Sequence, residues 1–253
     1  MLPTSVQAGL WGLLSGSALL LGALFGYYAH ISPRLIAGIM AFGSGVLISA
    51  LSFDLMDEAY KAGGFDATSI GFVGGAAIYT LANFIVNRYG ARHRKRSGAH
   101  QAGESKEKGS NGAAIAVGAL LDGIPEAIVI GISMIKGGTV SLVAVAAVFL
   151  SNIPEGLSSA AGMRKAGKRA AHVFGIWGSI AAVSGLAALA GYSLFSGCGV
   201  NVTAAITAVA AGAILAMIAD TMIPEAFEET RDFAGLITVL GFLCAFALTK
   251  LRP

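Results

Sequence analysis

Residues 112–135 read GAAIAVGALLDGIPEAIVIGISMI, an apolar stretch that contains an Asp and a Pro-Glu pair. A helix that crosses a bilayer needs about 20 mostly apolar residues. Seven further stretches of this kind lie near residues 8–29, 34–56, 67–87, 139–162, 171–194, 201–224 and 233–250. The sequence therefore predicts one all-α integral membrane domain over residues 1–253, with eight transmembrane helices.

Composition and charge agree with a membrane protein. Hydrophobic residues make up 55% of the chain and charged residues only 12%, which is atypical of a soluble protein. Lys and Arg accumulate in cytoplasmic loops. In this chain every second loop is basic and holds Arg34, Arg88, Arg92, Arg94, Lys95, Arg96, Lys106, Lys108, Arg164, Lys165, Lys168, Arg169 and Arg231. We therefore expect a multi-pass protein of the cell membrane with both termini outside.

The longest connection, residues 88–111, mixes charge, Gly and Ser and contains almost no apolar residue. Such a composition predicts a solvated cytoplasmic loop. Its basic run, with His93 and His100, is interpreted as a topology signal and a linker. No nucleic-acid partner is expected.

Two sequence echoes indicate an internal repeat. Residues 124–127 (IPEA) resemble residues 153–156 (IPEG), and residues 55–59 (LMDEA) resemble residues 222–226 (MIPEA). Each echo joins predicted helices that cross the membrane in opposite directions. Inverted repeats of this kind are typical of transporters, whose substrate sites lie near the bilayer midplane. The predicted organisation is an inverted 3+2+3 repeat.

Prolines and carboxylates coincide inside the predicted spans. Three of the six prolines follow Ile and precede Glu. A proline inside a helix leaves the carbonyl four residues earlier without its partner, so Pro125 frees Leu121 and Pro154 frees Leu150. A carboxylate at mid-bilayer costs on the order of 3 kcal/mol and is usually paired or functional. Glu126 and Glu155 therefore mark a candidate site.

The candidate site is rich in oxygen atoms. Asp122 precedes Glu126 by four residues, and Ser151 and Asn152 precede Glu155 by four and three, so each set shares one helical face. Oxygen ligands suit hard or borderline divalent cations. Three carboxylates around one ion predict pH-sensitive transport. The candidate metal ligands are Asp122, Glu126, Ser151, Asn152 and Glu155, and the candidate pathway residues are Asp54, Glu58, Asp220 and Glu225.

At these residues the chain resembles the ZIP (Zrt/Irt-like) family of divalent metal transporters, in particular its prokaryotic branch. The most specific segment is SNIPEGLSSAAG, residues 151–162. The resemblance spans essentially the whole chain. It implies eight spans, a metal centre between the fourth and fifth helices with Glu126 and Glu155 as ligands, and entry of the metal into the cytoplasm by movement of a helix bundle past a scaffold. It is also compatible with a homodimer.

The chain departs from the family pattern on both helices. The fourth helix of the family usually reads His-Asn-x-Pro-Glu, whereas this chain has Asp122 and Gly123 at the first two positions. On the fifth helix Ser151 stands where His or Gln is common. Imidazole suits zinc, and carboxylate suits manganese. Zinc, manganese and ferrous iron are therefore all candidate substrates, and a two-metal centre is not expected.

Two other functions are alternatives to transport. A degenerate family member could bind metal as a sensor or scaffold without moving it. A membrane-embedded metal-dependent hydrolase is disfavoured because the chain has no HExxH pair and no serine-nucleophile motif. We expect no enzyme activity and no prosthetic group, with the lipid bilayer and divalent metal ions as the partners.

Overall fold

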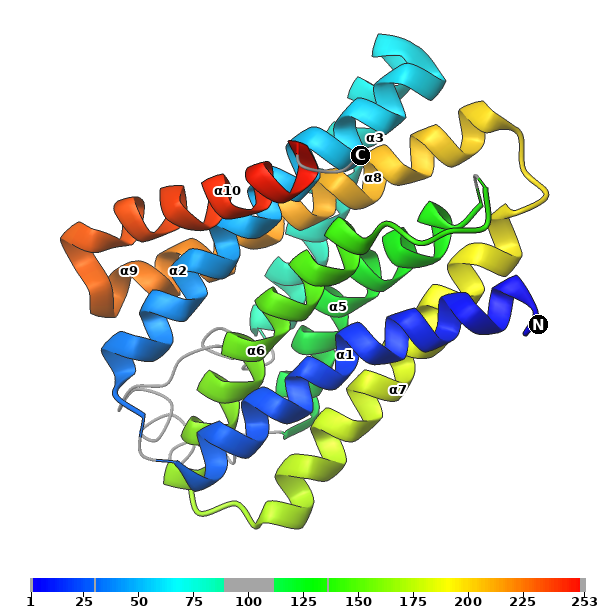
Figure 1. Ribbon diagram of the computed structural model, residues 1–253. Helices are drawn as coiled ribbons and strands as arrows, with labels where there is room; N and C mark the ends of the chain where they lie inside the picture. The colour runs from blue at the N-terminus through cyan, green and yellow to red at the C-terminus, as the bar shows by residue number, and fades with distance from the viewer. Residues whose placement is uncertain (1, 30, 89–111, 136, 251–253) are drawn as a thin grey trace.

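Helices dominate the structure, a computed structural model that describes residues 2–29, 31–88, 112–135 and 137–250. Within these ranges the chain forms helices and turns and contains no strand, which confirms the predicted all-α class. Figure 1 shows the long helices lying roughly side by side in an elongated bundle. The predicted loop, with His93 and His100, lies outside these ranges apart from Arg88.

The helices begin where the sequence offers caps. Ser32 accepts a hydrogen bond from the Leu35 amide at the start of α2, with Pro33 in the first helical position, and Ser141 caps α6 in the same way. The elements are α1 (Thr4–Tyr28), α2 (Pro33–Ala50), η1 (Leu51–Leu55), α3 (Met56–Val86), α5 (Gly112–Ser133), α6 (Leu142–Lys165), α7 (Ala170–Phe195), α8 (Val200–Met217), η3 (Ile218–Met222), α9 (Ile223–Thr230), η4 (Arg231–Phe233) and α10 (Ala234–Lys250).

Five helical segments of the described chain are long and apolar enough to cross a membrane: Thr4–Tyr28, Pro33–Val86, Leu142–Lys165, Ala170–Phe195 and Val200–Lys250. The second and fifth contain 54 and 51 residues. At 1.5 Å per residue each far exceeds a hydrocarbon core of about 30 Å. These features are compatible with a multi-pass membrane protein.

The two longest segments are interrupted by unusual backbone conformations. Gly64 has φ 72° and ψ −177°, and Arg231 has φ 45° and ψ −114°. The predicted spans 34–56 and 67–87 lie on either side of Gly64, and the spans 201–224 and 233–250 lie on either side of Arg231. Figure 1 shows the chain turning sharply where α9 meets α10. The predicted span 112–135 corresponds to α5, which is not one of the five segments.

The two parts of the chain that contain or adjoin these breaks, α2–η1–α3 and α8–η3–α9, have elements that begin at the same spacing. Elements α2, η1 and α3 begin at residues 33, 51 and 56, and elements α8, η3 and α9 begin at residues 200, 218 and 223, which is 167 residues later in each case. The two breaks, at residues 64 and 231, are separated by the same 167 residues. Both short η1 and η3 segments are π-helical. The echo between residues 55–59 and 222–226 therefore extends to the conformation of the backbone.

Glycine contacts join α1 with α6 and α7, α5 with α7, α2 with α10, and α3 with α8. We call α1, α5, α6 and α7 the first helix group, and α2, α3, α8, α9 and α10 the second helix group. Within each group the backbones touch: a Cβ atom added to Gly22 or Gly156 would overlap a carbonyl between α1 and α6, and one added to Gly75 or Gly212 would overlap a carbonyl between α3 and α8. Small residues allow this close approach in membrane helices.

Between the two groups, Gly43 shows a longer backbone separation than those four glycines inside the groups. A Cβ atom on Gly43 of α2 would lie 3.5 Å from Cα of Ser151 on α6, which is ordinary van der Waals contact. Apolar side chains from both groups, including Met40, Val129 and Ile214, form the main buried cluster. The groups therefore meet mainly through side chains.

Candidate functional site

The five predicted metal ligands are all buried near the middle of α5 and α6. Their exposed fractions are 2% for Asp122, 3% for Glu126, 3% for Ser151, 4% for Asn152 and 8% for Glu155. Ionisable side chains are almost never buried to this extent unless they are paired or functional. The motifs that the sequence singled out are therefore interior features of the bundle.

Apolar contacts bring the two motifs towards each other. Ile130 of α5 packs in one small cluster with Val145 and Val148 of α6. Glu126 lies one turn before Ile130, and Asn152 lies one turn after Val148. The polar turns of both helices therefore flank this apolar contact.

Asp122 has a partner that the sequence analysis did not identify. The hydroxyl of Tyr79, on α3, donates a hydrogen bond of 2.6 Å to Oδ1 of Asp122, and both side chains are 2% exposed. This bond connects the second helix group to the first. The spacing of Tyr79 and the buried Asn83, one turn apart on an apolar helix, is the sequence signal that could have indicated a polar face on α3.

Asn152 and Ser151 are oriented by hydrogen bonds to backbone carbonyls. The Nδ2 atom of Asn152 donates to the carbonyl of Ser15 on α1 at 3.1 Å, and Oγ of Ser151 donates to the carbonyl of Val148 at 2.9 Å. Donation through these atoms leaves the Asn152 Oδ1 atom and the lone pairs of the Ser151 hydroxyl as acceptors. Both residues can therefore present an oxygen to a cation.

The carboxylates do not converge in the way that the sequence analysis expected. Among the residues that the structure describes, no group of three or more His, Cys, Asp or Glu side chains is arranged to hold a metal ion. Asp122, Glu126 and Glu155 thus form no three-carboxylate cage in this conformation. Oδ1 of Asp122 accepts its described hydrogen bond from Tyr79 on α3.

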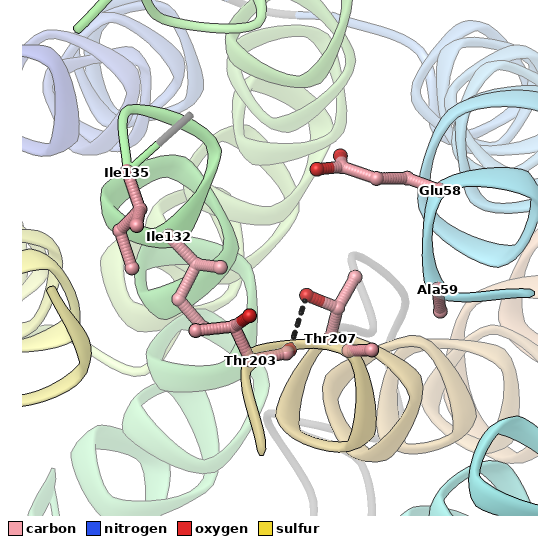
Figure 2. A pocket seen from close by; sticks show the side chains of 7 residues that line it. Glu58, Ala59, Ile132, Ile135, Thr203 and Thr207 are labelled. Carbon is pink, nitrogen blue, oxygen red and sulfur yellow. Dashed lines mark hydrogen bonds between the residues drawn. The ribbon is translucent and has the colours of Figure 1, made fainter. Parts of the chain in front are cut away.

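Glu58 lies at a separate, small pocket. Figure 2 shows its carboxylate extending from α3 into a space bounded by Ile132 of α5, by Ile135 in the turn after α5, and by Thr203 and Thr207 of α8. The pocket has a volume of about 10 Å³. That is about the room needed by one water molecule, so the pocket can accept a single water or a bare ion and no organic substrate.

The remaining pathway residues occupy the matching segments of the two halves. Asp54 lies in η1 and is partly buried, whereas Asp220 lies in η3 and is exposed. Glu225 follows in α9, 167 residues after Glu58, and is partly buried. π-helical turns inside α-helices occur frequently at functional sites.

Comparison with known proteins finds no family model that matches this chain and no match among curated proteins.

Proposed function

We propose that this protein is a multi-pass membrane transporter of divalent metal cations, with zinc, manganese or ferrous iron as substrate. The observation that carries the proposal is the burial of Glu126 and Glu155, each placed directly after a proline inside a helix of more than 20 residues. Placing such carboxylates at mid-bilayer is unfavourable by on the order of 3 kcal/mol each. A cation bound between the two carboxylates offsets the free-energy cost of burying them.

The ligand chemistry follows from the described contacts. Two glutamates balance the charge of one divalent ion, and Asn152 and Ser151 add neutral oxygens whose orientation is set by Ser15 and Val148. The third carboxylate, Asp122, accepts a hydrogen bond from Tyr79 through Oδ1, and such a bond can orient a carboxylate ligand. With no imidazole at these positions, manganese and ferrous iron compete well with zinc.

We further propose eight membrane crossings related by an inverted repeat. The 167-residue correspondence of α2–η1–α3 with α8–η3–α9 supports it. So does the pattern of helix packing: α1 packs on α6 as α7 packs on α5, and α2 packs on α10 as α8 packs on α3. In this repeat, α1 corresponds to α7, α2 to α8, the part of α3 after Gly64 to α10, and α5 to α6. Replacing each helix by its counterpart turns the first pair of each comparison into the second.

Transport requires the site to be exposed to each side in turn, and the two helix groups offer a boundary for that movement. Backbone contacts at Gly22 and Gly156 fasten α6 to α1 inside the first helix group. We propose that this group moves as one unit against the second helix group, with Gly43 at the sliding contact. The Tyr79–Asp122 bond crosses the same boundary and must break during the movement.

The distribution of charge supports an orientation in the membrane. The end of the bundle formed by residues 26–36 and 161–169 carries Arg34, Arg164, Lys165, Lys168 and Arg169, whereas the end near Glu58 has an exposed Lys61 that is paired with Asp57 at 2.6 Å. Basic ends face the cytoplasm. We propose a cell-membrane location with both termini outside, entry past Glu58 and exit near Glu225. On the resemblance carried by residues 151–162, we propose that the chain belongs to the ZIP family.

The test is metal uptake into liposomes that contain the purified full chain. Zinc, manganese, ferrous iron and cadmium are compared for the native protein, Glu126→Gln and Glu155→Gln. Glu229→Gln is the matched control, because Glu229 is exposed on α9. Transport predicts flux for the native protein and the control, and a loss of at least tenfold in both site variants at unchanged melting temperature. Metal binding without flux in the native protein would instead identify a sensor.

A further inference from the structure

A pocket of about 370 Å³ opens where α1 ends, α2 begins and α6 ends. Figure 1 shows the end of α1 and the start of α2 close together at the lower left of the bundle. Small residues leave the space open: Gly26 and Ala29 line it from the α1 side, and Ala161 lines it from α6. The volume greatly exceeds what a bare metal ion requires.

The lining of this pocket is positively charged. Arg164 and Lys165 both contribute to it, and none of the described lining residues is acidic. Nη1 of Arg164 donates to the carbonyl of Tyr27 at 2.6 Å, and the guanidinium lies 6.0 Å from the Tyr27 ring. A guanidinium carries five N–H donors. The Tyr27 contact therefore positions the group while further donors serve a ligand.

The pocket lies at the ends of long helices, and the ends of a membrane-spanning helix lie near the lipid headgroups. It adjoins the termini of three long helices, and next to it the Tyr27 hydroxyl donates to the carbonyl of Lys168, in the connection between α6 and α7. The beginning of α2 contributes Ser32 and Pro33 to the lining. Basic pockets between transmembrane helices are known sites for anionic headgroups.

We infer that this pocket binds a phosphate group, carried by an anionic phospholipid of the surrounding leaflet. The phosphodiester accepts hydrogen bonds from Arg164 and Lys165, and the acyl chains leave along the exposed apolar side chains of the neighbouring helices. Such a lipid bridges α6 of the first helix group and α2 of the second helix group, so its occupancy bears on their relative position. Lipid binding at this pocket requires that the protein lies in a membrane, and it does not depend on metal transport.

The test uses the full chain in nanodiscs of phosphatidylcholine with increasing phosphatidylglycerol, read out by melting temperature and by native mass spectrometry of retained lipid. We expect a saturable increase in melting temperature with phosphatidylglycerol. Lys165→Gln is expected to weaken the apparent affinity roughly fivefold, as for the loss of one basic residue at an anionic surface. Arg164→Gln is a second variant, and Arg169→Gln, an exposed neighbour outside the lining, is the control.

The outcomes separate the two sources of phosphate. Stabilisation by phosphatidylglycerol alone, sensitive to Lys165→Gln and insensitive to Arg169→Gln, supports a lipid site. Equal, Lys165-sensitive stabilisation by millimolar inorganic phosphate supports the same site with a soluble ligand. No preference for either phosphate source over phosphatidylcholine and chloride overturns the inference. Equal effects of Lys165→Gln and Arg169→Gln also overturn it, because they would indicate diffuse surface charge.

Discussion

Replacing Tyr79 by Phe removes one hydroxyl from the interior while the aromatic ring keeps its packing. The lost hydrogen bond is short, 2.6 Å, and both Tyr79 and Asp122 are 2% exposed, so water does not readily replace it. A hydrogen bond to a charged group contributes about 1.5–3 kcal/mol. If Asp122 acts as a metal ligand in the bound state, Tyr79 is the residue that orients it. Loss of such an orienting partner typically lowers metal affinity by about 10–100-fold.

The assay is titration of Mn²⁺ and Zn²⁺ into the purified protein in detergent, by calorimetry or by competition with a fluorescent chelator. Tyr79→Phe should raise the dissociation constant about 10–100-fold. Tyr60→Phe, which removes the hydroxyl of a residue that is 56% exposed, should leave it unchanged within about twofold. Melting temperature is recorded for each variant to separate affinity from folding.

Asp122→Asn completes the design. If Asp122→Asn lowers affinity strongly while Tyr79→Phe leaves it unchanged in a folded protein, the hydroxyl has no part in orienting the ligand. If neither variant changes affinity, Asp122 is not a ligand.

Three further substitutions test the packing and the backbone. Gly156→Ala forces a Cβ atom against the Leu19 carbonyl and should destabilise the protein by about 1–3 kcal/mol. Gly178→Ala is the control: with nothing within 4 Å of the added Cβ atom, it should not lower the melting temperature. Gly64→Ala places a side chain in a backbone region that is essentially restricted to glycine and should destabilise by about 1–3 kcal/mol in detergent unfolding. Arg231→Gly relieves a positive φ and should raise the melting temperature, and a decrease would show that the arginine side chain matters more than its backbone.

Much of the fold can be predicted from local features of the sequence. Long apolar runs predict helices, and Ser32 with Pro33 and Ser141 predict where two of them begin. The echo of residues 55–59 in residues 222–226 predicts matching segments, and the structure extends this match to the π-helical turns and the two breaks. Each of these features depends on residues that are close together in the sequence, so a single sequence is enough to identify them.

The contacts across helices could not be predicted in the same way. Burial of Glu126 and Asn152 was anticipated from their apolar neighbours, but Tyr79 lies 43 residues from Asp122 along the chain. Its partner depends on how α3 and α5 pack, which no local pattern specifies. The expected three-carboxylate cage differs from the structure for the same reason, because the orientation of Asp122 is determined by a helix outside its own motif.

The 167-residue correspondence also pairs the surroundings of the two end carboxylates. Glu58 corresponds to Glu225, but Thr203 and Thr207, which line the Glu58 pocket, correspond to Ile36 and Met40. In a transporter built from such halves, conformations open to either side have similar free energies, and the ion gradient determines the net direction of movement. For the proposed transport, the two hydroxyl groups beside Glu58 would favour a hydrated ion there, whereas the corresponding positions, Ile36 and Met40, offer no hydroxyl.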